Sequence, residues 1–278
     1  MRAAFVTLTA LAVLGLSAAS GVTAPAQATV DAPWSTYPTL DRDPFGANDW
    51  SCRPTQERPY PAVIVHGTFG DRASLLDALS FALTGDGYCV FALDYGNRAT
   101  GPIEESAGEL RDFVAQVLEE TGAQRVSIVG HSQGGMMPRY YIKNLGGDGL
   151  VEDLVGLAPS NHGTTVSGDG GSGSTQGCEA CDQQQAGSEF LEELNHPDET
   201  PGDVDYTQVV TRYDEVVVPY TSGFLTGARS TNITLQDYCA ANTAEHLTIP
   251  MDRQAVAWVL HAFGQEGPAD PDAPIGCL

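Results

Sequence analysis

The chain has 278 residues, with 13 Lys and Arg against 36 Asp and Glu, which gives a formal net charge of −23 at pH 7. A field of this sign repels phosphates and therefore argues against nucleic-acid binding and against adhesion to anionic lipid. The length and the 42% content of hydrophobic residues suit one α/β domain with a buried core.

The first 28 residues have the pattern of a signal peptide. Arg2 supplies a positive start, residues 5–16 form an apolar run, and residues 26–28 read Ala-Gln-Ala, which is an A-x-A cleavage site. The apolar run is too short for a membrane anchor, and no later stretch approaches a membrane span. We therefore expect a secreted, extracellular protein with no integral membrane segment, in which residues 29–278 form a single domain.

Strand and helix patterns alternate from residue 60 onward, after an N-terminal arm (residues 29–59) that has no periodicity. The strand patterns occupy residues 60–65, 89–93, 125–129, 154–157, 206–210 and 232–235. The helical patterns occupy residues 75–83, 103–118 with a stop at Gly122, 134–144, and a final stretch with Val256, Val259, Leu260 and Phe263. This alternation is typical of a mainly parallel sheet covered by helices on both faces.

The segment 160–203 interrupts the alternation. Residues 167–174 have the composition of a flexible linker, and Phe190, Leu191 and Leu194 predict a short helix. Long loops inside compact domains tend to be functional, so we interpret the segment as a lid, with an ordinary surface excursion as the alternative.

All six cysteines follow the predicted signal peptide. An even number in an exported chain predicts three disulfides, for which fifteen connectivities exist. The sequence does not choose among them, but closeness in the chain and the tying of an end to the core favour Cys52–Cys89, Cys178–Cys181 and Cys239–Cys277. Cys-x-x-Cys could instead be a redox or zinc half-site, although no further zinc ligands are evident nearby. No ligand spacing elsewhere argues for a metal.

Residues 130–134 read GHSQG, which matches the nucleophile elbow G-x-S-x-G. The motif alone occurs by chance in many proteins, but here a strand pattern runs directly into it and a helix pattern follows it. Such a turn is so tight that it needs small residues at positions 130 and 134, and it presents the serine hydroxyl at a helix N-terminus. We therefore predict that Ser132 is a nucleophile, with a merely tight turn as the alternative.

A serine hydroxyl needs a histidine to take its proton, and an acid to orient that histidine. Of the six histidines, His246 lies in a loop between the last strand and the last helix, where this kind of α/β fold presents its base. The acid should come between serine and base in chain order, and Asp214 follows a predicted strand. Asp205, Glu215 and Asp237 remain alternatives.

The oxyanion of an acyl-transfer intermediate needs two backbone N–H donors. One is expected from Gln133, the residue after the nucleophile. The other is expected from the loop 66–70, which reads HGTFG, because Gly67 lets the chain turn so that the Thr68 amide faces the serine. The Thr68 hydroxyl could add a third donor. A simple strand-ending turn at this loop is compatible with the same role.

Four motifs together resemble the secreted class 2 lipases of actinomycetes. They are IVHGTFG at 64–70, GHSQGG at 130–135, APSNHGT at 158–164 and YDEVV at 213–217, and the segment 178–195 with its Cys-x-x-Cys and three glutamines resembles the lid of those lipases. The resemblance spans about residues 60–264. It implies an α/β-hydrolase fold and an extracellular triacylglycerol lipase or esterase without an organic cofactor. It also implies the triad Ser132, Asp214 and His246, with Thr68 and Gln133 as oxyanion donors.

We therefore predict a monomeric carboxylic-ester hydrolase, a triacylglycerol lipase that meets its lipid or ester substrate at an oil–water interface and works through an acyl-enzyme. A short-chain or polyester (cutinase-like) esterase and an acyltransferase are the alternatives. A non-catalytic binding module is disfavoured because serine, base and acid are all present. Acyl-chain preference and regioselectivity depend on the shape of the pocket.

Overall fold

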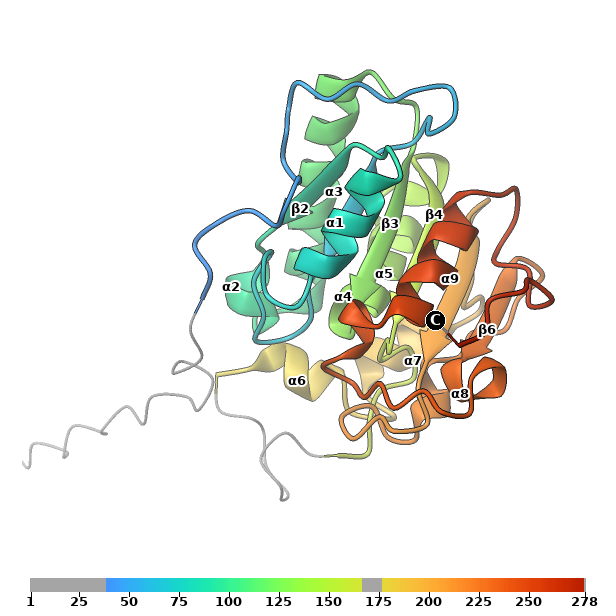
Figure 1. Ribbon diagram of the computed structural model, residues 1–278. Coiled ribbons are helices and arrows are strands. Elements are labelled where there is room, and N and C mark those ends of the chain that lie inside the picture. Colours follow the sequence, from blue (N-terminus) through green and yellow to red (C-terminus); the bar gives the residue numbers. More distant parts are fainter. Residues whose placement is uncertain (1–38, 167–176, 278) are drawn as a thin grey trace, which may run out of the picture. The chain divides into compact units, whose positions relative to one another are not determined.

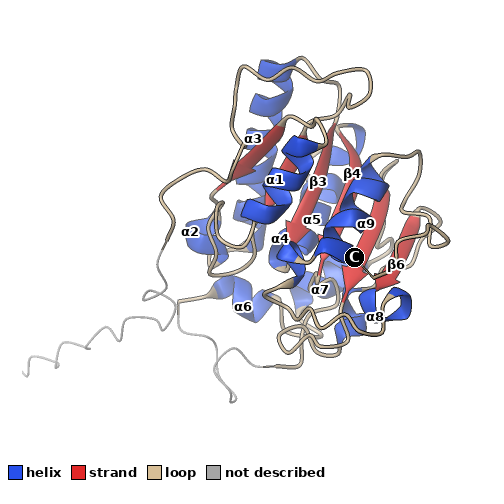
Figure 2. Cartoon of the chain, viewed as in Figure 1, coloured by secondary structure: helices blue, strands red, loops and turns tan. Residues whose placement is uncertain are grey.

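The computed structural model describes residues 39–166 and 177–277. The predicted signal peptide, the first residues of the predicted arm and the linker-like stretch 167–174 lie outside these ranges. The described strands form one parallel sheet in the order β2-β1-β3-β4-β5-β6 (Figures 1 and 2). They are β1 Ala62–Val65, β2 Val90–Leu93, β3 Val126–His131, β4 Val151–Leu157, β5 Asp205–Val210 and β6 Ser230–Thr234.

Helices cover both faces of this sheet (Figure 2). They are α1 Asp77–Gly85, α2 Gly96–Ala99, α3 Ile103–Thr121, α4 Gln133–Met136, α5 Pro138–Asn144, α6 Glu179–Gln183, α7 Glu189–Asn195, α8 Leu235–Tyr238 and α9 Arg253–Phe263. Alternate residues of one strand enter different apolar clusters: Val63 packs with the residues of α3 and α5, whereas Ile64 packs with those of α1 and α9. Because both faces are covered, β1 and β2 are continuous apolar runs, with the sequences AVIV and VFAL.

The longest helix, α3, shows how the local sequence sets an element's ends. Its buried residues, among them Leu110 and Val114, recur at helical spacing and face the sheet. The helix ends at Gly122, whose φ of 73° lies in the left-handed region that glycine adopts without strain. The predicted helix and its stop are therefore confirmed.

Several predicted elements differ from the structure. The strand expected over residues 154–157 begins at Val151, and the helix expected over residues 75–83 is Asp77–Gly85. The single helix expected over residues 134–144 is broken at Met137, because Pro138 has no N–H to continue the hydrogen-bond ladder. The last predicted strand does not include Leu235, which begins α8. The break at Met137 thus divides the predicted helix in two, whereas the helical Leu235 moves the end of a predicted strand by one residue.

Residues 39–59 contain no regular helix or strand and lie along the edge of the sheet. Asn48 donates its backbone N–H to Val90 O at 2.9 Å, and its side-chain amide makes two hydrogen bonds with the backbone of Ala92, at 2.8 and 2.9 Å. Trp50 packs on Phe91 with the ring centroids 4.9 Å apart. This segment therefore covers the exposed edge of β2, which would otherwise present unpaired backbone groups.

Three disulfides tie the described chain together: Cys52–Cys89, Cys178–Cys181 and Cys239–Cys277. They are the pairs that proximity in the sequence favours. The first joins the N-terminal segment to the residue before β2, and the third joins the end of α8 to the C-terminal segment. Within residues 39–166 and 177–277, no helix combines the length and the apolar composition needed to cross a bilayer.

Candidate active site

Ser132 lies in a strained turn between β3 and α4. Its φ of 57° and ψ of −124° fall in a region that non-glycine residues rarely adopt. The turn is possible because neither neighbouring glycine has a side chain: a Cβ on Gly130 would lie 1.8 Å from the Gly134 carbonyl oxygen, and one on Gly134 would lie 2.4 Å from the His66 carbonyl oxygen. The sequence motif and the strained conformation therefore coincide at this serine.

Asp214 and His246 form a buried hydrogen-bonded pair, 2.8 Å apart between Oδ2 and Nδ1. The other carboxylate oxygen of Asp214 accepts the backbone N–H groups of Val216 at 2.9 Å and Val217 at 2.8 Å, so the carboxylate has a fixed direction. Because His246 Nδ1 donates to a carboxylate, Nε2 is the nitrogen that is free to take up a proton.

One cavity of about 330 Å³ brings the predicted nucleophile and base together. It is lined by Thr68, Phe69, Ser132, Ser160, Thr164, Val166, Cys181, Gln184, Gln185, Glu215, Val216, Val217, His246 and Leu247. The lining contains the predicted nucleophile, base and oxyanion threonine, although they are far apart in the chain. Among the hydrogen bonds of the described residues, none joins the Ser132 hydroxyl to the His246 ring, a contact that often tightens only when substrate is bound.

The loop that carries His246 is held by a second histidine. His131 Nε2 faces the His246 carbonyl oxygen at 2.8 Å, and burial lowers the pKa of His131 to about 3. The His131 ring is therefore neutral at neutral pH, with its proton on Nε2, since the carbonyl can only accept. The sequence alone does not reveal this role of His131, because a variable position inside G-x-S-x-G gives no sign of a partner so distant in the chain.

The predicted oxyanion donors belong to two segments that meet at the serine. A Cβ on Gly67 would lie 2.9 Å from Ser132 Cβ, so the loop that carries Thr68 approaches the serine closely because residue 67 is glycine. The backbone hydrogen bonds in the described part of the chain include no acceptor for the amides of Thr68 and Gln133. Two unpaired amides beside a strained serine are the arrangement that binds a developing oxyanion.

The three alternative acids lie in other surroundings. Asp205 accepts from the Arg229 guanidinium at 2.9 Å, at the N-terminal end of β5. Asp237 forms an ion pair with Arg212 on the surface. Glu215 lines the cavity but is exposed, and no hydrogen bond among the described residues joins it to His246. The structure therefore brings only Asp214 to the base.

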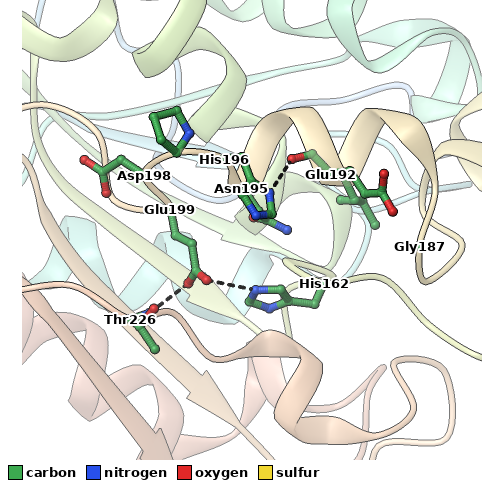
Figure 3. A pocket seen from close by; sticks show the side chains of 10 residues that line it. His162, Gly187, Glu192, Asn195, His196, Asp198, Glu199 and Thr226 are labelled. Carbon is green, nitrogen blue, oxygen red and sulfur yellow. Dashed lines mark hydrogen bonds and ion pairs between the residues drawn. The ribbon is translucent and has the colours of Figure 1, made fainter.

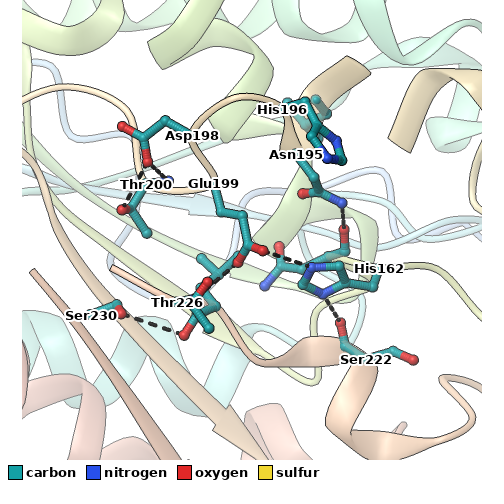
Figure 4. A network of polar contacts seen from close by, with 12 residues as sticks. His162, Asn195, His196, Asp198, Glu199, Thr200, Ser222, Thr226 and Ser230 are labelled. Atoms are coloured by element: carbon teal, nitrogen blue, oxygen red, sulfur yellow. Dashed lines mark hydrogen bonds and ion pairs between the residues drawn. The ribbon is translucent and has the colours of Figure 1, made fainter. Parts of the chain in front are cut away.

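A larger cavity of about 430 Å³ lies beside α7 and does not contain the predicted catalytic side chains (Figure 3). Inside it, the two ring nitrogens of His162 face Ser222 O at 3.1 Å and Glu199 Oε1 at 3.3 Å (Figure 4). Glu199 Oε2 accepts the backbone N–H of Thr226 at 2.9 Å. This network joins three loops and contains no strained nucleophile, so the smaller cavity at Ser132 is the candidate active site.

Comparison with known proteins identifies the family of the chain. The model of the family described as Lipase (class 2) matches residues 59–256. The chain is 36% identical to the triacylglycerol lipase of Vibrio cholerae over 124 residues, which are 38% of this chain and 39% of the relative. It is also 36% identical to the triacylglycerol lipase of Pseudarthrobacter phenanthrenivorans over 87 residues, 29% of this chain and 27% of the relative. The matches thus span at most 39% of either relative's length.

Solved lipase structures share the fold at low sequence identity. Aspergillus fumigatus lipase B superposes with a TM-score of 0.69 and 19% identity, covering 84% of this chain and 57% of that one. The mature form of Bacillus licheniformis lipase BlEst2 gives a TM-score of 0.56 and 15% identity, covering 72% of this chain and 89% of that one. The predicted α/β-hydrolase fold is confirmed.

Proposed function

The chain belongs to the class 2 lipase family, and we propose that it hydrolyses carboxylic esters, with triacylglycerol as its substrate. The observation that carries this proposal is the hydrogen bond between Asp214 and His246, on a cavity that also contains the strained Ser132. The relatives that share part of this chain's sequence are named as triacylglycerol lipases.

In the proposed reaction, His246 Nε2 takes the proton of the Ser132 hydroxyl while Oγ attacks the ester carbonyl carbon. Asp214 keeps His246 in the required tautomer and stabilises the imidazolium that forms. The imidazolium then gives its proton to the departing alcohol oxygen as the C–O bond breaks, which leaves an acyl-enzyme. Water, deprotonated by His246, attacks the acyl carbon and releases the carboxylic acid and the serine.

In this proposal the backbone amides of Thr68 and Gln133 donate hydrogen bonds to the negative oxygen of each tetrahedral intermediate. These donors are fixed by the backbone before substrate arrives, so they stabilise the charge without reorganising. Removal of one such donor commonly lowers kcat by about 100-fold to 1000-fold, so the two amides contribute substantially to the proposed rate.

The mouth of the cavity is apolar, which favours a lipid over a small soluble ester. Val166 is 42% exposed, Val216 is 44% exposed and Leu247 is 54% exposed, and all three line the cavity. Large apolar side chains at the rim of a substrate pocket lose contact with water when they meet an apolar phase. We assign these residues to contact with a triacylglycerol surface.

We also propose that the described residues of the segment 160–203 act as a lid. The helix α7 is fixed to α5, because Lys143 Nζ donates to the carbonyl oxygens of Glu193 at 2.8 Å and Leu194 at 2.9 Å. The region around α6 instead contributes Cys181 and Gln184 to the cavity wall. We therefore place the substrate-facing part of the lid at α6.

We also propose that the protein is secreted. The signal-peptide pattern of residues 1–28 and the resemblance to secreted actinomycete lipases support this proposal. The three disulfides support it as well, because disulfides are typical of oxidising compartments.

The test is hydrolysis of p-nitrophenyl esters from acetate to palmitate and of emulsified triolein, with Ser132→Ala beside the wild type. Hydrolysis of triolein that disappears in a folded Ser132→Ala variant supports the proposal. Activity confined to short soluble esters would replace the lipase by an esterase with the same mechanism. Wild-type turnover by Ser132→Ala would contradict the mechanism itself.

A further inference from the structure

Gln184, at the C-terminal end of α6, reaches the loop that carries the proposed oxyanion donor. Its Nε2 donates to Thr68 Oγ1 and to Ala180 O, both at 3.0 Å, and its Oε1 accepts from Ser160 Oγ at 2.7 Å. The orientation of the amide is determined because a backbone carbonyl can only accept, so the nitrogen must be on the side of Ala180 and Thr68. Gln184 is 7% exposed, and its contacts are therefore screened little by water.

A second side-chain amide reaches the same hydroxyl. Gln133 Nε2 donates to Thr68 Oγ1 at 3.1 Å and to Ala99 O at 2.9 Å, and the latter carbonyl again determines which end of the amide carries the nitrogen. A hydroxyl oxygen has two lone pairs, and both are used when it accepts two N–H groups. The Thr68 hydroxyl must therefore direct its hydrogen elsewhere.

The remaining direction for that hydrogen is the cavity that Thr68 shares with Ser132. The hydrogen bonds of residues 39–166 and 177–277 include no acceptor for the Thr68 O–H. An oxygen that becomes negative at Ser132 during acyl transfer supplies such an acceptor. A donor held before the charge forms needs no reorganisation when it does form.

We propose that Gln184 is a positioning residue, which acts together with Gln133 to hold the Thr68 hydroxyl as a hydrogen-bond donor to the oxyanion. The inference rests on the proposed ester-hydrolase function and deepens it. It follows that the region around α6 contributes to the chemistry when it lies against the cavity, in addition to covering substrate.

Several contacts hold α6 in the position that this role requires. Gln183 Oε1 accepts the first backbone N–H of α3, that of Ile103, at 2.8 Å. The Thr164 N–H donates to Gln184 O at 3.0 Å, and the disulfide Cys178–Cys181 closes the first turn of the helix. The neighbouring glutamine therefore anchors the helix, which leaves Gln184 to face the site.

Two substitutions separate the donor from the bulk of the side chain. Gln184→Met removes the N–H at similar length, and we expect kcat on a soluble p-nitrophenyl ester to fall about tenfold, with KM within about twofold. Gln184→Glu offers an acceptor instead, so the Thr68 O–H turns toward residue 184 and a negative charge lies near the oxyanion. We expect kcat of this variant to fall about 100-fold.

The matched control is Gln254→Met. Gln254 is also buried, with its amide bonded to Leu235 O at 3.3 Å and to the Asn242 side chain at 2.9 Å, but it lies outside the cavity. We expect this variant to lower the thermal midpoint as Gln184→Met does, while kcat stays within about twofold of wild type. A loss of kcat in both variants that follows the thermal midpoint would overturn the inference, because stability alone would explain it.

The decisive measurement is a double-mutant cycle with Thr68→Val, which removes the hydroxyl and keeps the backbone amide. If Gln184 acts through that hydroxyl, Gln184→Met causes no further loss of kcat in the Thr68→Val background. The positioning role alone would be overturned if the two losses of kcat multiply in the double variant. It would also be overturned if Gln184→Met has the same kcat as an active wild type. A folded wild type that hydrolyses no ester would instead overturn the proposed function, so the two failures are distinguishable.

Discussion

His131, the residue before the proposed nucleophile, donates a hydrogen bond from Nε2 to the backbone carbonyl of His246, the proposed base, at 2.8 Å. The bond joins the turn at Ser132 directly to the loop that carries His246. The relative position of serine and base therefore does not depend only on how that loop is attached to its neighbouring elements. Burial lowers the pKa of His131 to about 3, so the ring is neutral near pH 7, and its Nε2–H donates to this carbonyl in the neutral and in the charged form alike.

We expect His131→Phe to lower kcat about tenfold without a comparable change in KM, because a lost buried hydrogen bond lets the base loop relax. The measurement is steady-state hydrolysis of a soluble p-nitrophenyl ester. His196, whose ring bonds to Glu192 O on the exposed surface, offers the control His196→Phe. Equal kcat in both variants would show that the bond to His246 does not position the base.

Asp214→Asn should lower kcat by about four orders of magnitude while the protein stays folded. Asparagine can present its amide to His246 Nδ1, which favours the tautomer that cannot act as base. Asp237→Asn, at the surface ion pair with Arg212, should leave kcat within about twofold of wild type. If the Asp237 variant loses activity and the Asp214 variant does not, the acid has been assigned to the wrong residue.

Asp153 on β4 makes folding stability depend on pH. Burial raises the pKa of Asp153 to about 8, against an ordinary value of 3.8, and its neighbour across the sheet in register is Asp205, whose pKa is also raised by burial. The folded state therefore holds a proton that the unfolded state has released. The resulting stabilisation is complete below about pH 4 and is lost progressively as the pH rises to about 8.

We expect Asp153→Asn to match the wild type near pH 4 and to exceed its free energy of unfolding near pH 8, and the difference should grow by at most about 1.4 kcal/mol per pH unit in between. Ser127, which donates to Asp153 at 2.7 Å, can bond to the asparagine in the same way. The measurement is urea unfolding at several pH values. The control is Asp112→Asn, at an exposed aspartate. If the free energy of unfolding changes with pH in the same way in the wild type and in both variants, Asp153 is not the source of the pH dependence.

Gly134→Ala should destabilise the fold by about 3 kcal/mol or more, since the added Cβ would lie 2.4 Å from the carbonyl oxygens of Val65 and His66. Gly108 in α3 is the matched control, because a Cβ there meets nothing within 4 Å. Gly108→Ala should stabilise the protein by about 1 kcal/mol through helix propensity. Thermal unfolding of both variants tests the pair, and tolerance of alanine at position 134 would contradict the described turn.

Leu247→Ser should lower hydrolysis of emulsified triolein several-fold more than hydrolysis of a soluble short-chain ester. The leucine is 54% exposed at the cavity mouth, and its burial against an apolar phase would contribute about 2 kcal/mol. Phe81 on α1 is 70% exposed and outside the cavity, so Phe81→Ser should change neither rate. Equal losses on both substrates would argue against contact between this rim and the lipid surface.

The sequence by itself determined the features that depend on neighbours in the chain. Apolar runs such as residues 62–65 identify buried strands, because most residues of a strand covered on both faces are apolar. The G-x-S-x-G turn is equally local: the glycines at 130 and 134 and the strained Ser132 lie within five positions. Chain order and loop position were enough to select Asp214 and His246 as the leading candidates.

Only the tertiary structure decided which distant groups meet. The sequence contains 36 Asp and Glu, so composition could not separate Asp214 from its alternatives, whereas the parallel order of β5 and β6 brings its loop to His246. The bonds from His131 to His246 and from Gln184 to Thr68 join residues 115 and 116 positions apart. Such contacts leave no periodic trace in the chain, because they are fixed by how the strands are ordered and by which loops gather at one end of the sheet.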